Sequence, residues 1–152
     1  MRFEQLTTGS TFHAGPREVT EQEIIEFARR YDPQPFHIDG EFAAATSWGG
    51  LIASGWMTCG IAMELTVNLI LKDSDSIGSP GVEDLRWENP VRPGDRLMLA
   101  ITVLESRVSA SRPMGIVRWR WELTNQANKR VLHLTATSLF DLFAERQSLS
   151  EA

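Results

Sequence analysis

The segment YDPQPFHID, residues 31–39, places an acidic side chain and an imidazole five residues apart. Two prolines lie between Asp32 and His37 and restrict the backbone that separates them. A carboxylate and an imidazole held at a fixed separation can transfer protons as a general acid–base pair, which requires heavy atoms about 3 Å apart. Asp32 and His37 are therefore the candidate catalytic residues. The alternative is structural: Asp32 would end a helix, and His37 would be a half-buried histidine with its hydrogen bonds satisfied.

A second candidate feature is Ala53-Ser54-Gly55, at the start of a long apolar segment. A helix that begins here presents unpaired backbone N–H groups and a positive dipole potential. Glycine lets a ligand approach the main chain closely. The Gly55 N–H is thus suited to bind a carbonyl oxygen that gains negative charge during a reaction. Ser54 can also cap this helix, and the two roles are compatible.

Other kinds of site are disfavoured. His37 and Asp39 could be two metal ligands, but no third ligand follows at a recognisable spacing, and the single Cys59 leaves no cysteine pair for zinc. The sequence contains no Gly-x-Ser-x-Gly motif of a serine hydrolase. We expect Cys59 to be a packing residue and Asp39 to cap a helix.

Helical signals surround the acid–imidazole segment. Thr20, followed three residues later by Glu23, is a capping-box pattern, and apolar residues at helical spacing then predict a helix near 21–31. The prolines that follow end it, because the residue before a proline is pushed out of the α region. Residues 39–46 suit a short helix. Residues 54–71 suit a long helix that is apolar nearly all round and therefore central.

The rest of the chain is typical of strands. In Val117–Leu123, apolar and charged residues alternate with a two-residue period, which places Trp119 and Trp121 on one face, in the core or an interface. Residues 72–80 are polar and rich in turn formers. The expected strands are 11–13, 17–19, 82–91 (broken by Asn89-Pro90), 97–104, 117–123 and 130–143.

One long apolar helix followed by several strands predicts an α+β fold, in which a curved antiparallel sheet wraps a long central helix. A length of 152 residues fits a single domain over residues 1–152. A sheet of this size leaves strand edges that need covering. We therefore expect a second copy to cover one of them, in a homodimer or a higher homo-oligomer.

Composition narrows the class of protein. The formal net charge is −5 and no basic run occurs, so a nucleic-acid partner is not expected. A lone cysteine and the lack of a signal-peptide pattern favour the reducing cytoplasm. Residues 51–71 have the length to cross a bilayer, but Glu64 and Asn68 favour burial inside a soluble fold, and no membrane association is expected.

At these residues the chain resembles the MaoC-like dehydratases, a family that includes the R-specific enoyl-CoA hydratases. The family motif runs Gly-Asp-x-Asn-Pro-hydrophobic-His, with a small residue after five more, and the matching residues here are Asp32, Pro35, Phe36, His37 and Ala43. Residues 53–57, 84–87 and 90–95 resemble later family segments. The resemblance covers residues 20–143 and implies the hotdog fold.

The resemblance also implies a reaction: reversible addition of water to a trans-2-enoyl thioester, giving an R-3-hydroxyacyl thioester. Asp32 would hold and deprotonate the water, His37 would position it and help deliver the proton to the α-carbon, and the Gly55 N–H would bind the thioester oxygen. Ser54 and Gln34 would join the substrate site, where many relatives have histidine and asparagine. The acyl group would be carried by CoA or acyl-carrier protein, with no metal and no other cofactor.

Two other functions remain open on this fold. One is an acyl-CoA thioesterase, in which a carboxylate activates water for attack on the thioester carbonyl. The other is a non-catalytic protein that binds acyl thioesters, with Asp32 and His37 in structural roles. A histidine retained beside Asp32 favours the hydratase.

Overall fold

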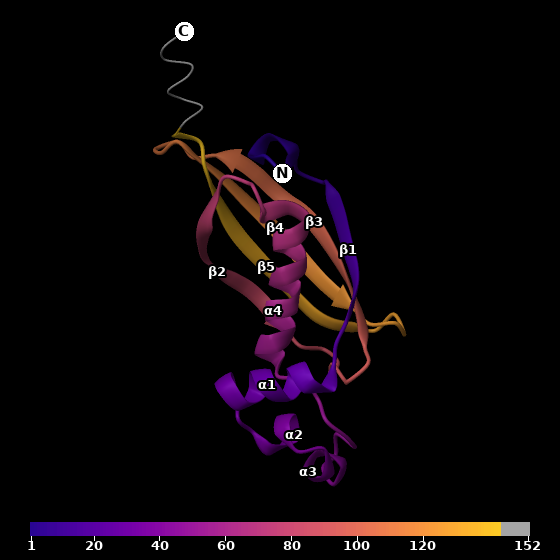
Figure 1. The fold of residues 1–152 in the computed structure, drawn as a ribbon. Helices are drawn as coiled ribbons and strands as arrows, with labels where there is room; N and C mark the ends of the chain where they lie inside the picture. Colours follow the sequence, from indigo (N-terminus) through magenta and orange to yellow (C-terminus); the bar gives the residue numbers. More distant parts are fainter. Residues whose placement is uncertain (144–152) are drawn as a thin grey trace.

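The computed structural model describes residues 1–143, and five of its strands form one antiparallel sheet in the order β1-β3-β4-β5-β2. The strands are β1 (Thr11–Glu18), β2 (Ser76–Arg86), β3 (Arg96–Val108), β4 (Met114–Thr124) and β5 (Arg130–Asp141). The helices are η1 (Phe3–Gln5), α1 (Glu21–Tyr31), α2 (Pro35–Ile38), α3 (Gly40–Ala44), α4 (Gly55–Thr66) and the π-helical turn η2 (Val67–Leu71). The curved sheet lies against α4, and helices α1, α2 and α3 lie at the end where α4 begins (Figure 1).

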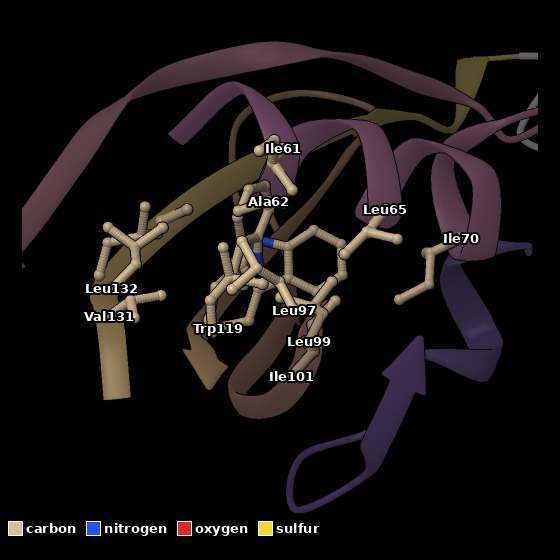
Figure 2. Close-up of a cluster of buried hydrophobic side chains, with 14 of the residues drawn as sticks. Ile61, Ala62, Leu65, Ile70, Leu97, Leu99, Ile101, Trp119, Val131 and Leu132 are labelled. Carbon is tan, nitrogen blue, oxygen red and sulfur yellow. The ribbon is translucent and has the colours of Figure 1, made fainter. Parts of the chain in front are cut away.

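Helix α4 is central, as its apolar sequence predicts. Its side chains Ile61, Ala62 and Leu65 are buried against the sheet, beside Trp119 and Leu99 (Figure 2). The α-helix is shorter than the expected 54–71, because the chain widens into a π-helical turn after Thr66. There the N–H of Lys72 donates to the carbonyl of Val67, five residues back.

Helix α1 confirms the predicted boundaries. The Thr20 hydroxyl accepts the N–H of Glu23 at its start, and the chain leaves the helix at Asp32, immediately before Pro33. A short helix that the sequence pattern did not predict begins at the second proline. Pro35 is the first residue of α2, a position where its missing N–H costs nothing. The short helix expected at 39–46 is α3, and the Asp39 carboxylate caps it by accepting the N–H groups of Glu41 and Phe42.

The alternation in β4 is confirmed. Val117, Trp119, Trp121 and Leu123 are buried, and the charged residues between them point to the other face. The expectation for residues 72–80 was wrong, since β2 begins at Ser76 and ends at Arg86, not at residue 91. The two short strands expected at 11–13 and 17–19 form one strand, β1, whose register shifts between Ala14 and Arg17.

Strand β2 closes one end of the sheet. It pairs with β5 on one side only, and almost all of its residues are exposed. Its register shifts three times, at segments that include Gly78 and Gly81 with positive φ of 129° and 156°. These irregularities explain why its composition predicts turns and not a strand.

Within residues 1–143, no helix combines the length and apolar character needed to cross a membrane. The long apolar segment noted in the sequence is the core helix α4 and its extension η2. The expectation of one domain over 1–152 extends past the described residues and stays a prediction.

Candidate active site

The acid and the imidazole converge. Asp32 is the residue that follows α1, and His37 lies on α2, so the turn between the two helices brings their side chains together. The distance from His37 Nε2 to Asp32 Oδ2 is 3.2 Å. His37 is 5% exposed, whereas the Asp32 side chain is 18% exposed and keeps contact with solvent. Asp32 ends α1, as the structural alternative expects, but His37 is buried and not half-buried.

A backbone carbonyl fixes the orientation of the imidazole. The distance from His37 Nδ1 to the Ile52 carbonyl oxygen is 2.6 Å. A carbonyl oxygen can only accept, so Nδ1 carries a proton and donates it to Ile52. In the neutral ring Nε2 therefore holds a lone pair that faces the Asp32 carboxylate, and in the protonated ring the Nε2–H donates to that carboxylate.

The Asp32 carboxylate is held by two further side chains. The Gln34 amide donates to Oδ1 at 2.8 Å, and the Ser54 hydroxyl also donates to the carboxylate. Burial by itself raises the pKa of Asp32, but these hydrogen bonds and the interaction with His37 outweigh it and lower the pKa below the ordinary aspartate value. Asp32 is thus an ionised, oriented proton acceptor at neutral pH.

The start of α4 completes the group. Ser54 is fully buried, and its hydroxyl accepts the N–H of Trp56 at 3.3 Å, as a helix cap does. Gly55 is the first helical residue, so its N–H has no acceptor within the helix. A side chain at Gly55 would collide with a neighbouring ring, because a Cβ built there lies 2.5 Å from Trp87. Glycine is required here for the close approach of that indole.

A cavity of about 180 Å³ lies beside these groups, and Asp32, Gln34 and Ser54 are not among the residues that line it. His37 and Gly55 both line it, so the imidazole-bearing residue and the first residue of α4 border the same space. The rest of the wall is mostly apolar and includes Trp48, Thr58, Trp87, Asn89 and Val131. A small ligand in this cavity can meet a proton acceptor on one side and a donor for an oxyanion on the other.

All five predicted site residues lie in this one region: Asp32, Gln34, His37, Ser54 and Gly55. The Ile52 carbonyl and Trp87 were missed. A backbone acceptor leaves no signature in residue type. Trp87 follows β2, a strand whose boundaries were predicted wrongly. Cys59 is half-buried on α4, where burial raises the pKa of its thiol despite a hydrogen bond from Trp87, as suits a packing residue.

This chain is similar to known proteins in sequence and in fold. Residues 3–120 match the MaoC-like domain family. The crystal structure of a MaoC-like dehydratase from Rhodospirillum rubrum is 39% identical, with a TM-score of 0.84 over 91% of this chain and 95% of that one. The uncharacterized protein YdeM of Bacillus subtilis is 28% identical over 131 residues, which are 86% of this chain and 92% of the relative.

A solved structure with lower sequence identity has a similar fold. The R-hydratase PhaJ1 from Pseudomonas aeruginosa is 24% identical, with a TM-score of 0.74 over 91% of this chain and 84% of that one. These neighbours confirm the predicted α+β class, a hotdog fold in which an antiparallel sheet wraps a long helix. The match over most of the sequence and the fold together establish that the chain belongs to the MaoC-like dehydratase family.

Proposed function

We propose that this protein is a hydratase/dehydratase that adds water reversibly to a trans-2-enoyl thioester, carried by CoA or an acyl-carrier protein. The observation that carries the proposal is the 3.2 Å approach of His37 Nε2 to Asp32 Oδ2 beside a cavity that Gly55 also lines. The dehydratases of the family and the fold shared with an R-hydratase support this reaction class.

The pair is suited to hold one water molecule. With Nδ1 protonated, Nε2 of the neutral ring and the Asp32 carboxylate are two neighbouring acceptors. Water has two protons and can donate one to each, which leaves an oxygen lone pair directed at the substrate. The lowered pKa of Asp32 keeps its carboxylate ionised, and so able to accept, over the neutral range.

In the proposed addition of water, all atoms, protons and electrons are accounted for without a cofactor. The water oxygen forms a bond to C3 of the enoyl group, and its proton passes to the Asp32–His37 pair. The double-bond electrons move toward the thioester oxygen, where the Gly55 N–H stabilises the enolate charge. The pair then returns a proton to C2, giving the 3-hydroxyacyl thioester. Donors aimed at charge that develops only during reaction lower the barrier more than they tighten substrate binding.

The experiment follows two signals with purified protein. Crotonyl-CoA reports hydration through loss of the conjugated double bond, and a saturated acyl-CoA reports thioester hydrolysis through release of free thiol. We expect double-bond loss without thiol release. Thiol release from the saturated substrate would instead identify a thioesterase. Binding of both substrates with neither signal would identify an acyl-thioester-binding protein.

Matched variants test the residues. Asp32→Asn and His37→Gln should each lower kcat for hydration by about 100-fold or more, as loss of a general acid–base group does. Asp39→Asn and His13→Gln are the controls, because Asp39 caps α3, where asparagine also serves, and His13 is exposed on β1. Near-normal turnover in either site variant, with the fold intact, would remove this mechanism.

We also propose that the protein acts as a homodimer or a higher homo-oligomer. Strand β2 offers a free edge at one end of the sheet, as the predicted covering by a second copy requires.

A further inference from the structure

A second cavity lies between α4 and the sheet, with a volume of about 200 Å³. Its walls are almost entirely apolar and include Trp56, Cys59 and Met63 of α4, Leu85 of β2, Trp121 of β4 and Leu134 of β5. No residue lines both this cavity and the one beside His37. The proposed reaction gives this second space no role.

Two tryptophans separate the cavities. Trp87 lines the cavity beside His37, and Trp56 lines the apolar cavity. Their rings meet edge to face, with centroids 5.1 Å apart and planes at 81°. Because each ring belongs to one cavity and contacts the other ring, the pair forms a partition between the two spaces.

Trp87 is fixed in this position by two contacts. Its ring lies against the backbone of Gly55, where a Cβ would come within 2.5 Å of it. Its indole also lies close enough to Cys59, a residue that lines the apolar cavity, to act on the pKa of that thiol. Trp87 thus touches the proposed oxyanion donor on one side and a wall residue of the second cavity on the other.

The sizes of the cavities give the partition a consequence. Each is smaller than the ~300–1,000 Å³ of common small-molecule sites, whereas the two joined would fall within that range. A thioester oxygen at the Gly55 N–H would place the acyl group beside the Trp87 ring. A short acyl group fits the cavity beside His37, while a longer chain needs the space behind the partition.

We propose that Trp87, supported by Trp56, is a specificity-determining residue that restricts the acyl group to short chains. This inference rests on the proposed hydratase function. In the wild-type protein the two tryptophans close the apolar cavity to substrate. Replacement of either tryptophan by a smaller side chain would open it. Removal of one or two methylene-sized clashes in a pocket changes relative kcat/KM by about 10–200-fold, which sets the size of the expected effect.

The test compares hydration of crotonyl-CoA and trans-2-octenoyl-CoA. We expect the wild-type protein to favour crotonyl-CoA, and Trp87→Leu to raise the octenoyl-to-crotonyl ratio of kcat/KM by about tenfold or more. Phe42→Leu is the control. Phe42 of α3 has a similar exposed fraction to Trp87, 48% against 44%, but lines neither cavity, so its variant should leave the ratio unchanged.

A second variant protects the test from loss of activity. Trp56→Val opens the partition from the apolar side and leaves the contact between Trp87 and Gly55 in place, so it should shift the ratio in the same direction. A wild-type protein that hydrates both substrates equally well would overturn the inference. So would an unchanged ratio in both variants, or loss of crotonyl-CoA hydration in both. A wild-type protein that hydrates neither substrate would contradict the proposed function itself.

Discussion

At the scale of single residues, several neighbouring groups act on the pKa of the Asp32 carboxylate. Burial, two hydrogen bonds and the neighbouring ring act on it in opposite directions, and the net effect is a lowered pKa. Gln34 contributes the largest of the stabilising interactions, through a 2.8 Å hydrogen bond to Oδ1. The ionised form therefore depends in part on a residue that does not line the cavity.

Gln34→Ala should move the acid limb of the pH–rate profile to higher pH. The amide stabilises the ionised carboxylate, so its removal raises the pKa of Asp32 in the folded protein. Catalysis needs the ionised form, so activity would be lost at a higher pH than in the wild type. The measurement is kcat/KM against pH. Gln22→Ala is the control, because Gln22 donates to Glu26 on the surface of α1; identical acid limbs in all three proteins would contradict the role given to Gln34.

The residue scale also separates what the sequence can predict from what it cannot. The spacing of Asp32 and His37 across two prolines predicts their approach, because proline fixes φ and the intervening chain is short. The partner of Nδ1 is not predictable in the same way. It is a main-chain oxygen fifteen residues further on, and every residue type carries one.

At the scale of elements, the start of α4 combines capping, close packing and the proposed oxyanion site within three residues. Gly55→Ala should destabilise the fold by about 1–3 kcal/mol, because its Cβ would overpack against Trp87. The same change should lower hydration, since the displaced ring and the proposed N–H donor are adjacent. Urea-induced unfolding measures the first effect, and the crotonyl-CoA assay measures the second.

Gly60→Ala on the same helix is the matched control. Among the described residues, no atom lies within 4 Å of a Cβ built at Gly60, other than its own neighbours and helix backbone. Alanine is more favourable than glycine inside a helix by about 1 kcal/mol, so this variant should be more stable than the wild type. Equal effects of the two substitutions would show that the Trp87 contact has no energetic weight.

The elements themselves were predicted unevenly, for physical reasons. The ends of α1 follow from Thr20 and Pro33, and β4 follows from a strict alternation that only a half-buried strand requires. The first half of β2 escaped prediction because Gly78, Pro80 and Gly81 are typical of turns. An edge strand tolerates these residues, because the N–H and C=O groups on one side of its backbone do not pair with a neighbouring strand.

At the scale of the whole molecule, apolar residues gather along one edge of the sheet. Ile77 and Val82 of β2 are each more than half exposed, and Val82 lines the same cavity as the exposed Trp56 and Met63 of α4. Figure 1 shows β2 beside α4, and residues of both elements line that cavity. A long strand edge flanked by apolar side chains favours pairing with another chain.

We therefore expect sedimentation velocity to give at least twice the 17.1 kDa of one chain. Val82→Lys should shift the protein toward the monomer, because a charge on the edge opposes strand pairing. Val108→Lys is the control. Val108 has a similar exposed fraction, but it lies at the end of β3, an interior strand that is not adjacent to β2. A wild-type protein that sediments as a monomer at all concentrations would refute self-association.

The hydrogen bond from His37 to Ile52 has a consequence for how this protein can change by mutation. Because the acceptor belongs to the main chain, replacing the Ile52 side chain does not remove it. The path of the main chain at residue 52 therefore determines which ring nitrogen carries the proton. A hydrogen bond of 2.8 Å from the Ala53 N–H to the Val91 carbonyl holds this path in place. Ile52 is buried, so another apolar side chain of similar size at this position would reshape the cavity wall beside the imidazole without removing the acceptor of its proton.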